Sequence, residues 1–124
     1  MHNKRPIYLA LHRIKLPLPG IVSILHRISG VLLFLALPLL LWALHTSLQS
    51  IETFTVLMQV FNQPLNKLFF FPMLWAFLHH FCAGLRYLAL DLGIGSGLAN
   101  SRASSRLVLI VSLALTILIG AQLC

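Results

Sequence analysis

Long apolar stretches alternate with short polar ones along the whole chain. Residues 21–44, 68–90 and 107–123 are predominantly apolar. A helix needs about 20 residues to cross a hydrocarbon core about 30 Å thick. The third stretch is the shortest, but it carries no charge between Arg106 and the C-terminus. The pattern therefore predicts an all-α membrane protein with three transmembrane helices.

A proline-rich segment, residues 16–20, precedes the first apolar stretch. Each proline lacks a backbone N–H and disfavours helical geometry in the residue before it, so we expect the first helix to begin at Gly20 or Ile21. The stretch is too long for the apolar part of a signal peptide, and no small-residue cleavage pattern follows it. We expect it to remain in the mature protein.

The composition agrees with lipid as the main solvent. Of the 124 residues, 59% are hydrophobic and 9% are charged, whereas a soluble domain carries roughly 25% charged residues. Cys82 lies inside an apolar stretch and Cys124 ends the chain, so neither suits a disulfide framework or a thiolate metal site. Both are expected to be plain small residues.

The net charge of +7 is concentrated at the ends of the apolar stretches. This distribution does not form the basic stripe of a nucleic-acid-binding protein, so we expect no nucleic-acid partner. The lysines and arginines concerned are Lys4, Arg5, Arg13, Lys15, Arg86, Arg102 and Arg106. Residues 45–66 contain none. Since positive residues stay on the cytoplasmic side, the N-terminus and second loop should be inside, and the first loop and C-terminus outside.

Ionisable residues inside the second span point to function, because each costs about 2.5–3.5 kcal/mol near a helix centre. At 100° per residue, His80, Gly84, Tyr87 and Asp91 fall on one stripe. A histidine with a glycine one turn away can bind haem iron while the bare backbone admits the flat ring. Alternatively, His80 hydrogen-bonds to a neighbouring helix and Gly84 permits close packing. Spacing alone leaves both interpretations open.

Two neighbours on the second span have other expected roles. His79 points about 100° away from His80 and suits packing or a polar network, although it is also a competing iron ligand. Arg86 lies near the inner end, where its side chain can extend to the headgroups or anchor the helix at the cytoplasmic face.

The first span carries a second polar cluster near its start. Ser23, His26 and Arg27 share one helix face, since they lie three and four residues apart. A hydroxyl, an imidazole and a guanidinium can together bind a carboxylate, a haem propionate or a quinone carbonyl. The same residues could instead hold the helix at the membrane interface.

Two motifs in this order resemble the succinate dehydrogenase cytochrome b subunit, the larger membrane anchor of respiratory complex II. The first is SILHRISG at residues 23–30, preceded by Arg-Pro at 5–6 and Leu-Pro at 16–17. The second is HxxxGLR at residues 80–86, followed by Asp-Leu-Gly at 91–93. Both fall on predicted spans, and the three-span pattern covers nearly the whole chain.

The resemblance implies a single membrane-anchor domain over residues 1–124 with its functional residues on two helices. His80 would be one axial ligand of a b-type haem iron, and a histidine of the small hydrophobic anchor subunit would be the other. His26 and Arg27 would lie near the haem propionates. Ser23 and Arg27 would help to form the ubiquinone site.

The family's chemistry is divided among subunits. The resemblance implies that a flavoprotein subunit oxidises succinate in the tricarboxylic acid cycle, and that an iron–sulfur subunit passes the electrons to quinone. This chain would hold the acceptor and no catalytic residue for succinate oxidation. One position departs from the family pattern, because Tyr87 stands where a second histidine is common.

The N-terminal sequence bears on where the protein is located. The N-terminus lacks an Arg- and Ser-rich transit segment, which favours a multi-pass protein of a bacterial cytoplasmic membrane over a mitochondrial one. One alternative is the anchor of a fumarate reductase, which runs similar chemistry in reverse. Another is a non-redox transporter component or assembly factor that uses His80 and Arg27 in a polar relay.

Overall fold

The computed structural model describes residue 10 and residues 13–124, and it is all-α within that part. Its helices are α1 (Leu18–Gln49), α2 (Ile51–Phe61), α3 (Pro64–Asp91) and α4 (Leu98–Leu123). Three of them, α1, α3 and α4, are long and apolar enough to cross a membrane. The predicted fold class and the three transmembrane helices are thus confirmed.

Helix α1 begins at Leu18, two or three residues before the predicted start at Gly20 or Ile21. Pro17 caps the helix in an extended conformation, and its carbonyl oxygen accepts from the N–H of Gly20 (2.9 Å) and of Ile21 (3.2 Å). Pro19 lies in the first turn, where the N–H has no partner within the helix. The prolines therefore start the helix, and the expected boundary was wrong.

The connection between the first two spans contains a further helix, α2, which the apolar pattern did not predict. Ser50 is extended and separates α2 from α1. The Thr53 N–H donates to Ser50 Oγ, and the Ser50 N–H donates to Thr53 Oγ1, both at 3.1 Å. This reciprocal capping box starts α2. With 11 residues, α2 is too short to cross a bilayer.

Helix α4 starts nine residues before the predicted third span. The loop from α3 to α4 contains Gly93, Gly95 and Gly97, whose φ angles are +76°, +76° and +110°. Residues with a Cβ atom rarely adopt these φ angles, so the glycines permit the tight turn. Arg102 and Arg106 are exposed on the early turns of α4.

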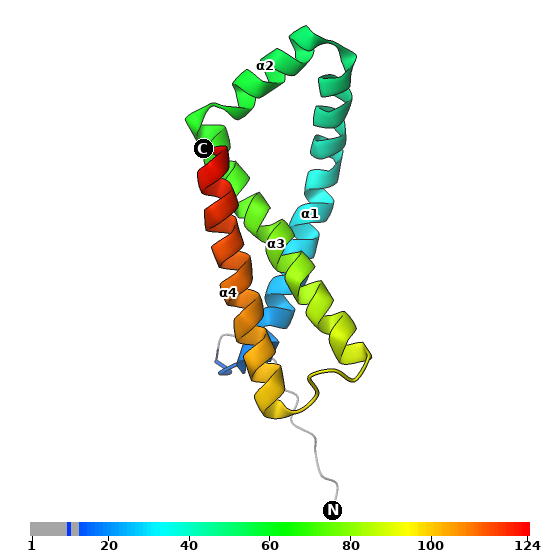
Figure 1. Ribbon diagram of the computed structural model, residues 1–124, viewed down its shortest axis with the longest axis vertical. Coiled ribbons are helices and arrows are strands. Elements are labelled where there is room, and N and C mark those ends of the chain that lie inside the picture. The colour runs from blue at the N-terminus through cyan, green and yellow to red at the C-terminus, as the bar shows by residue number, and fades with distance from the viewer. Residues whose placement is uncertain (1–9, 11–12) are drawn as a thin grey trace, which may run out of the picture.

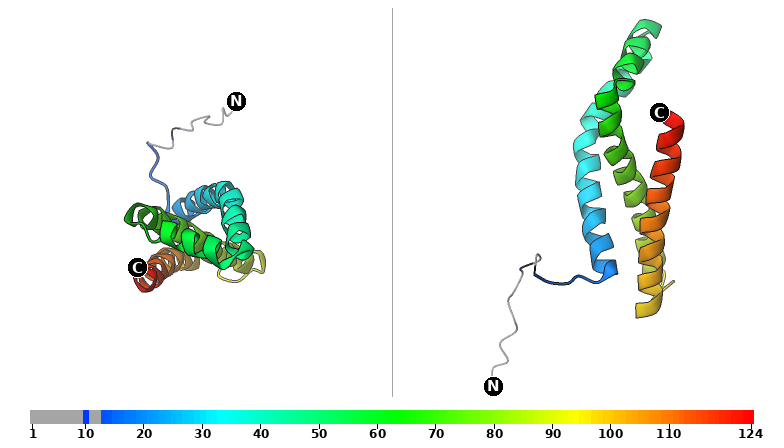
Figure 2. Two further views of the ribbon diagram at one scale, coloured as in Figure 1. Left: turned by 90° about the horizontal axis from the view of Figure 1, so that it is seen from above. Right: turned by 90° about the vertical axis from the view of Figure 1, so that its left-hand side faces the viewer.

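Helix α3 packs between α1 and α4, and α2 joins the far end of α1 to the start of α3 (Figure 1). The start of α1, the end of α3 and the start of α4 lie at one end of the molecule (Figures 1 and 2). Exposed Arg13, Lys15, Arg102 and Arg106 belong to this end. These segments and their positive charges therefore lie together at one end of the molecule.

The core of the described part is small for a chain of this length. Val22, Ala83 and Val108 form its apolar cluster, one from each long helix. Most large apolar side chains are exposed, as expected where lipid or partner helices surround the protein. Helix α1 is the least covered of the three long helices. In its most apolar stretch of 18 residues 6% are buried, against 22% in the corresponding stretches of α3 and α4.

Candidate functional site

Two histidine rings stack where α1 packs against α3. The centroids of His26 and His80 lie 4.2 Å apart, and the ring planes differ by 3°. Both side chains are half-buried. The two polar clusters found in the sequence therefore meet at one pair of imidazoles.

The backbone of α1 fixes the orientation of the His80 ring. His80 Nδ1 lies 3.0 Å from the carbonyl oxygen of His26. A carbonyl can only accept, so Nδ1 carries the proton and donates. The Ser29 hydroxyl donates to the same oxygen at 2.8 Å, and its Oγ lies 3.3 Å from His80 Nδ1. In the neutral ring, the lone pair is then on Nε2.

His80 Nε2 makes no hydrogen bond to any residue that the structure describes. A ring whose one nitrogen donates to a backbone carbonyl and whose other nitrogen keeps a lone pair is the usual arrangement of a metal-binding histidine. The donor geometry of His80 is therefore suited to one coordination bond from Nε2.

Two glycines leave room for the paired rings. A Cβ on Gly30 would lie 2.9 Å from His80 Cε1, closer than real Cβ contacts. A Cβ on Gly84 would lie 3.8 Å from His26 Nε2, an ordinary contact. The sequence singled out Gly84 as bare backbone for the flat haem ring, and that role stays a prediction. In the structure Gly84 lies beside His26, and Gly30 of α1 leaves the space in which the His80 ring lies.

Tyr87 extends the cluster on the side of His26. Its ring packs edge-on against His26, with centroids 5.1 Å apart and planes at 61°. The Tyr87 hydroxyl is buried and has no hydrogen-bond partner in the described residues. His80, Gly84 and Tyr87 thus face α1 together, as the predicted stripe requires. Asp91, at the end of the stripe, is exposed.

The other two residues of the first cluster make no hydrogen bond to His80. Ser23 is half-buried and Arg27 is exposed, and neither forms a side-chain hydrogen bond with the part of the chain that the structure describes. The structure therefore brings His26 to His80 and leaves the Arg27 guanidinium on the surface of α1.

His79 is fully buried and packs away from His80. Its ring stacks on Trp75, with centroids 5.0 Å apart and planes at 23°. Neither ring nitrogen has a hydrogen-bond partner among residues 13–124. Of the two roles expected for His79, the structure shows packing.

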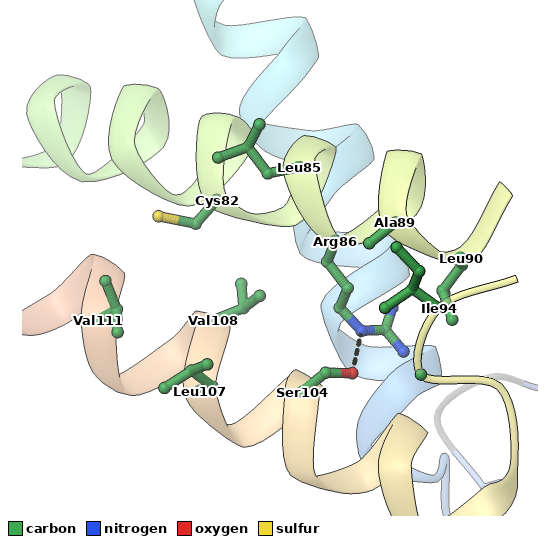
Figure 3. Close-up of a pocket in the computed structure, with 11 residues that line it drawn as sticks. Cys82, Leu85, Arg86, Ala89, Leu90, Ile94, Ser104, Leu107, Val108 and Val111 are labelled. Carbon is green, nitrogen blue, oxygen red and sulfur yellow. Dashed lines mark hydrogen bonds between the residues drawn. The ribbon is translucent and has the colours of Figure 1, made fainter. Parts of the chain in front are cut away.

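Arg86 is buried between α3 and α4. Its Nε donates to Ser104 Oγ at 2.9 Å (Figure 3). Its Nη2 donates to Ser101 Oγ at 2.9 Å and lies 3.4 Å from the Ser101 carbonyl oxygen. Arg86 therefore connects two helices. The sequence held a signal for this contact in the serines at 101, 104 and 105, but helical periodicity does not say which helices meet.

Comparison with known proteins assigns this architecture to one family. The profile of the succinate dehydrogenase/fumarate reductase transmembrane subunit matches residues 1–119. A Coxiella burnetii protein named succinate dehydrogenase cytochrome b556 subunit is 40% identical over 121 residues, which cover 97% of each chain. Proteins of the same name from Rickettsia felis and Paracoccus denitrificans are each 32% identical, over 96% and 94% of this chain and 93% and 89% of theirs.

Proposed function

Because this chain belongs to the family of succinate dehydrogenase/fumarate reductase transmembrane subunits, we propose that it is the cytochrome b anchor of a bacterial succinate dehydrogenase. Residues 1–124 form one membrane-anchor domain, with the N-terminus in the cytoplasm. The chain shares a b-type haem with a small hydrophobic anchor subunit. Ubiquinone bound at this anchor accepts the electrons that leave succinate on the flavoprotein subunit and pass through the iron–sulfur subunit.

The hydrogen-bonding of His80 carries the proposal. The His26 carbonyl holds the proton on Nδ1, which leaves the Nε2 lone pair for the iron. The donor geometry therefore fits the group: His80 would bind the haem iron from this chain, and a histidine of the small anchor subunit would bind it from the other. When bound, the haem supplies a one-electron carrier whose potential depends on its ligands and their hydrogen bonds.

His26 and Arg27 are the proposed partners of the haem propionates. The His26 ring stacks on the His80 ring, so a group bound to His80 would lie close to His26 and to the adjacent residue Arg27. Arg27 is the adjacent residue and is exposed on α1. Its planar guanidinium can bind a carboxylate through two parallel hydrogen bonds.

Ser23 and Arg27 are the proposed quinone-binding residues. They lie one turn apart on α1, near the end that we assign to the cytoplasmic side. A quinone carbonyl gains negative charge as the quinone is reduced. The Arg27 guanidinium stabilises that charge, and the Ser23 hydroxyl can donate to the same oxygen.

The proposal is tested by the reduced-minus-oxidised visible spectrum of the complex, co-expressed with its partner subunits, in wild type, His80→Ala and His79→Leu. We expect a b-type signal that His80→Ala abolishes or shifts and that His79→Leu retains. His79→Leu is a matched control because it alters the adjacent buried histidine. A signal that changes only with His79→Leu would refute the assignment of His80. An assembled wild-type complex without haem would favour a non-redox role.

A further inference from the structure

A cavity of about 370 Å³ lies between the end of α3 and the start of α4 (Figure 3). Its walls are apolar and come from both helices, with Cys82, Leu85 and Ala89 on α3 and Leu107, Val108 and Val111 on α4. The loop after α3 contributes Ile94. Arg86 and Ser104 bring polar groups to the lining. The cavity is thus an apolar slot with the positively charged side chain of Arg86 in its lining.

The cavity lies on another side of α3 than the histidine pair, and Tyr87 stands between them. The Arg86 guanidinium carbon lies 5.4 Å from the centroid of the Tyr87 ring, which packs on His26. His80, Gly84 and Tyr87 face α1, whereas Arg86 points from α3 toward α4. Six residues at 100° each turn Arg86 about 120° away from His80 around the helix axis. A ligand in the slot would therefore approach α3 from another side than a group bound at His80.

The charge of Arg86 has no counter-charge within the chain. Only 8% of the residue is exposed, and its recorded hydrogen bonds go to neutral serine groups. The chain has two acidic residues, Glu52 and Asp91, both described and neither paired with Arg86. A buried cation without an opposite charge is costly. The site therefore favours an anion from outside the chain.

Arg86 also has N–H groups that the serines do not use. Nε and Nη2 are used by Ser101 and Ser104, whereas Nη1 makes no hydrogen bond to the residues that the structure describes. Its two N–H groups can bind oxygen atoms of a phosphate. The serines hold the guanidinium in place, so little side-chain freedom is lost on binding.

We propose that this cavity binds one acidic phospholipid, with its phosphate on Arg86 and part of an acyl chain between α3 and α4. The volume is near the lower end of ligand pockets, about 300–1,000 Å³, and suits a single chain. Exposed Arg102 and Arg106 on the same turns of α4 favour a headgroup with net negative charge over a zwitterionic one. The cavity lies by the end of α3 and the start of α4, the end of the molecule where the headgroups of the cytoplasmic leaflet are expected.

The test uses the whole complex, delipidated in mild detergent and titrated with phosphatidylglycerol or phosphatidylcholine, with bound lipid counted by native mass spectrometry. We expect one phosphatidylglycerol to bind about tenfold or more tightly than phosphatidylcholine. Arg86→Gln should remove most of this preference. Arg13→Gln, an equal change of charge at an exposed position that does not line the cavity, should alter affinity less than about twofold.

A second pair of variants tests the cavity without altering Arg86. Val111→Phe fills the slot and should weaken phosphatidylglycerol binding, whereas Leu113→Phe on the exposed face of α4 should not. Equal affinity for the two lipids, or unchanged binding in both Arg86→Gln and Val111→Phe, would overturn the proposal. Displacement of phosphatidylglycerol by ubiquinone at equal concentration would also overturn it, because the slot would then hold the quinone tail.

Discussion

At the scale of the single residue, the orientation of His80 depends on a backbone carbonyl and on a missing side chain. The His26 carbonyl fixes the proton on His80 Nδ1, and Gly30 leaves the space in which the ring lies. Neither feature requires a particular side chain opposite His80. The backbone of α1 therefore sets the orientation of His80, the histidine that carries the proposed chemistry.

Gly30→Ala should disturb His80, because the new methyl group would lie 2.9 Å from its Cε1 atom. The imidazole must shift, which lengthens its bond to the His26 carbonyl. We expect a shifted haem absorbance maximum and lower haem content per complex, measured by visible spectroscopy. Gly20→Ala is the control, since its nearest added contacts are ordinary at 3.7 Å. Identical spectra for wild type and Gly30→Ala would contradict the assigned position of His80.

Arg27→Leu and Ser23→Ala should lower quinone reduction and spare succinate oxidation. We expect about a tenfold or greater loss of succinate-to-quinone activity for Arg27→Leu and a smaller loss for Ser23→Ala, because each removes a donor to the reduced quinone oxygen. Activity with an artificial dye acceptor should stay near wild type. Arg13→Leu, another exposed arginine, is the control. Equal loss of both activities would indicate failed assembly instead.

Sequence reasoning predicted which residues share a helix face, but not how the faces meet. Helical periodicity correctly grouped His80, Gly84 and Tyr87, because direction around one axis follows from residue number. The contact of His26 with His80 depends on where α1 crosses α3. The contact of Gly30 with His80 and the hydrogen bond between Arg86 and Ser104 also depend on how two helices align. A single sequence does not state that alignment.

At the scale of the helix, hydropathy predicted the membrane-crossing segments and missed their ends. An apolar window excludes residues 98–106, whose serines and arginines form the first turns of α4. It also excludes α2, which is short and starts at a hydrogen-bonded cap rather than at an apolar boundary. Helix ends were set by Pro17, Ser50 and the glycine-rich loop, which are local hydrogen-bonding and dihedral signals.

Gly120→Val should loosen the packing of α4 on α3. The position is fully enclosed, and any Cβ there would overlap the Phe71 ring. Overpacking of this kind costs about 1–3 kcal/mol. We expect a lower midpoint of thermal unfolding for the detergent-solubilised complex. Ala121→Val, at the exposed neighbouring position, should leave the midpoint unchanged, and equal midpoints for both variants would contradict the packing.

At the scale of the whole molecule, we expect α1, α3 and α4 to cross the membrane in alternate directions, with the start of α1 inside and the end of α4 outside. Alkaline phosphatase fused after Cys124 should be active, because this reporter folds only outside the cytoplasm. The same reporter fused after Arg106 should be inactive, since Arg102 and Arg106 at the start of α4 are expected to stay inside. Measured phosphatase activity, normalised to fusion protein abundance, distinguishes the two. The reverse pattern would refute the orientation.

The sparse cover of α1 bears on the fate of a copy made without its partners. This helix carries His26 and Arg27 near one end and buries little of its length against its own chain. In lipid, polar groups on an uncovered helix are unfavourable, and neighbouring subunits remove that cost only on assembly. We therefore expect a solitary copy to be a substrate for membrane quality control, so that the supply of its neighbours would govern how long each newly made chain survives.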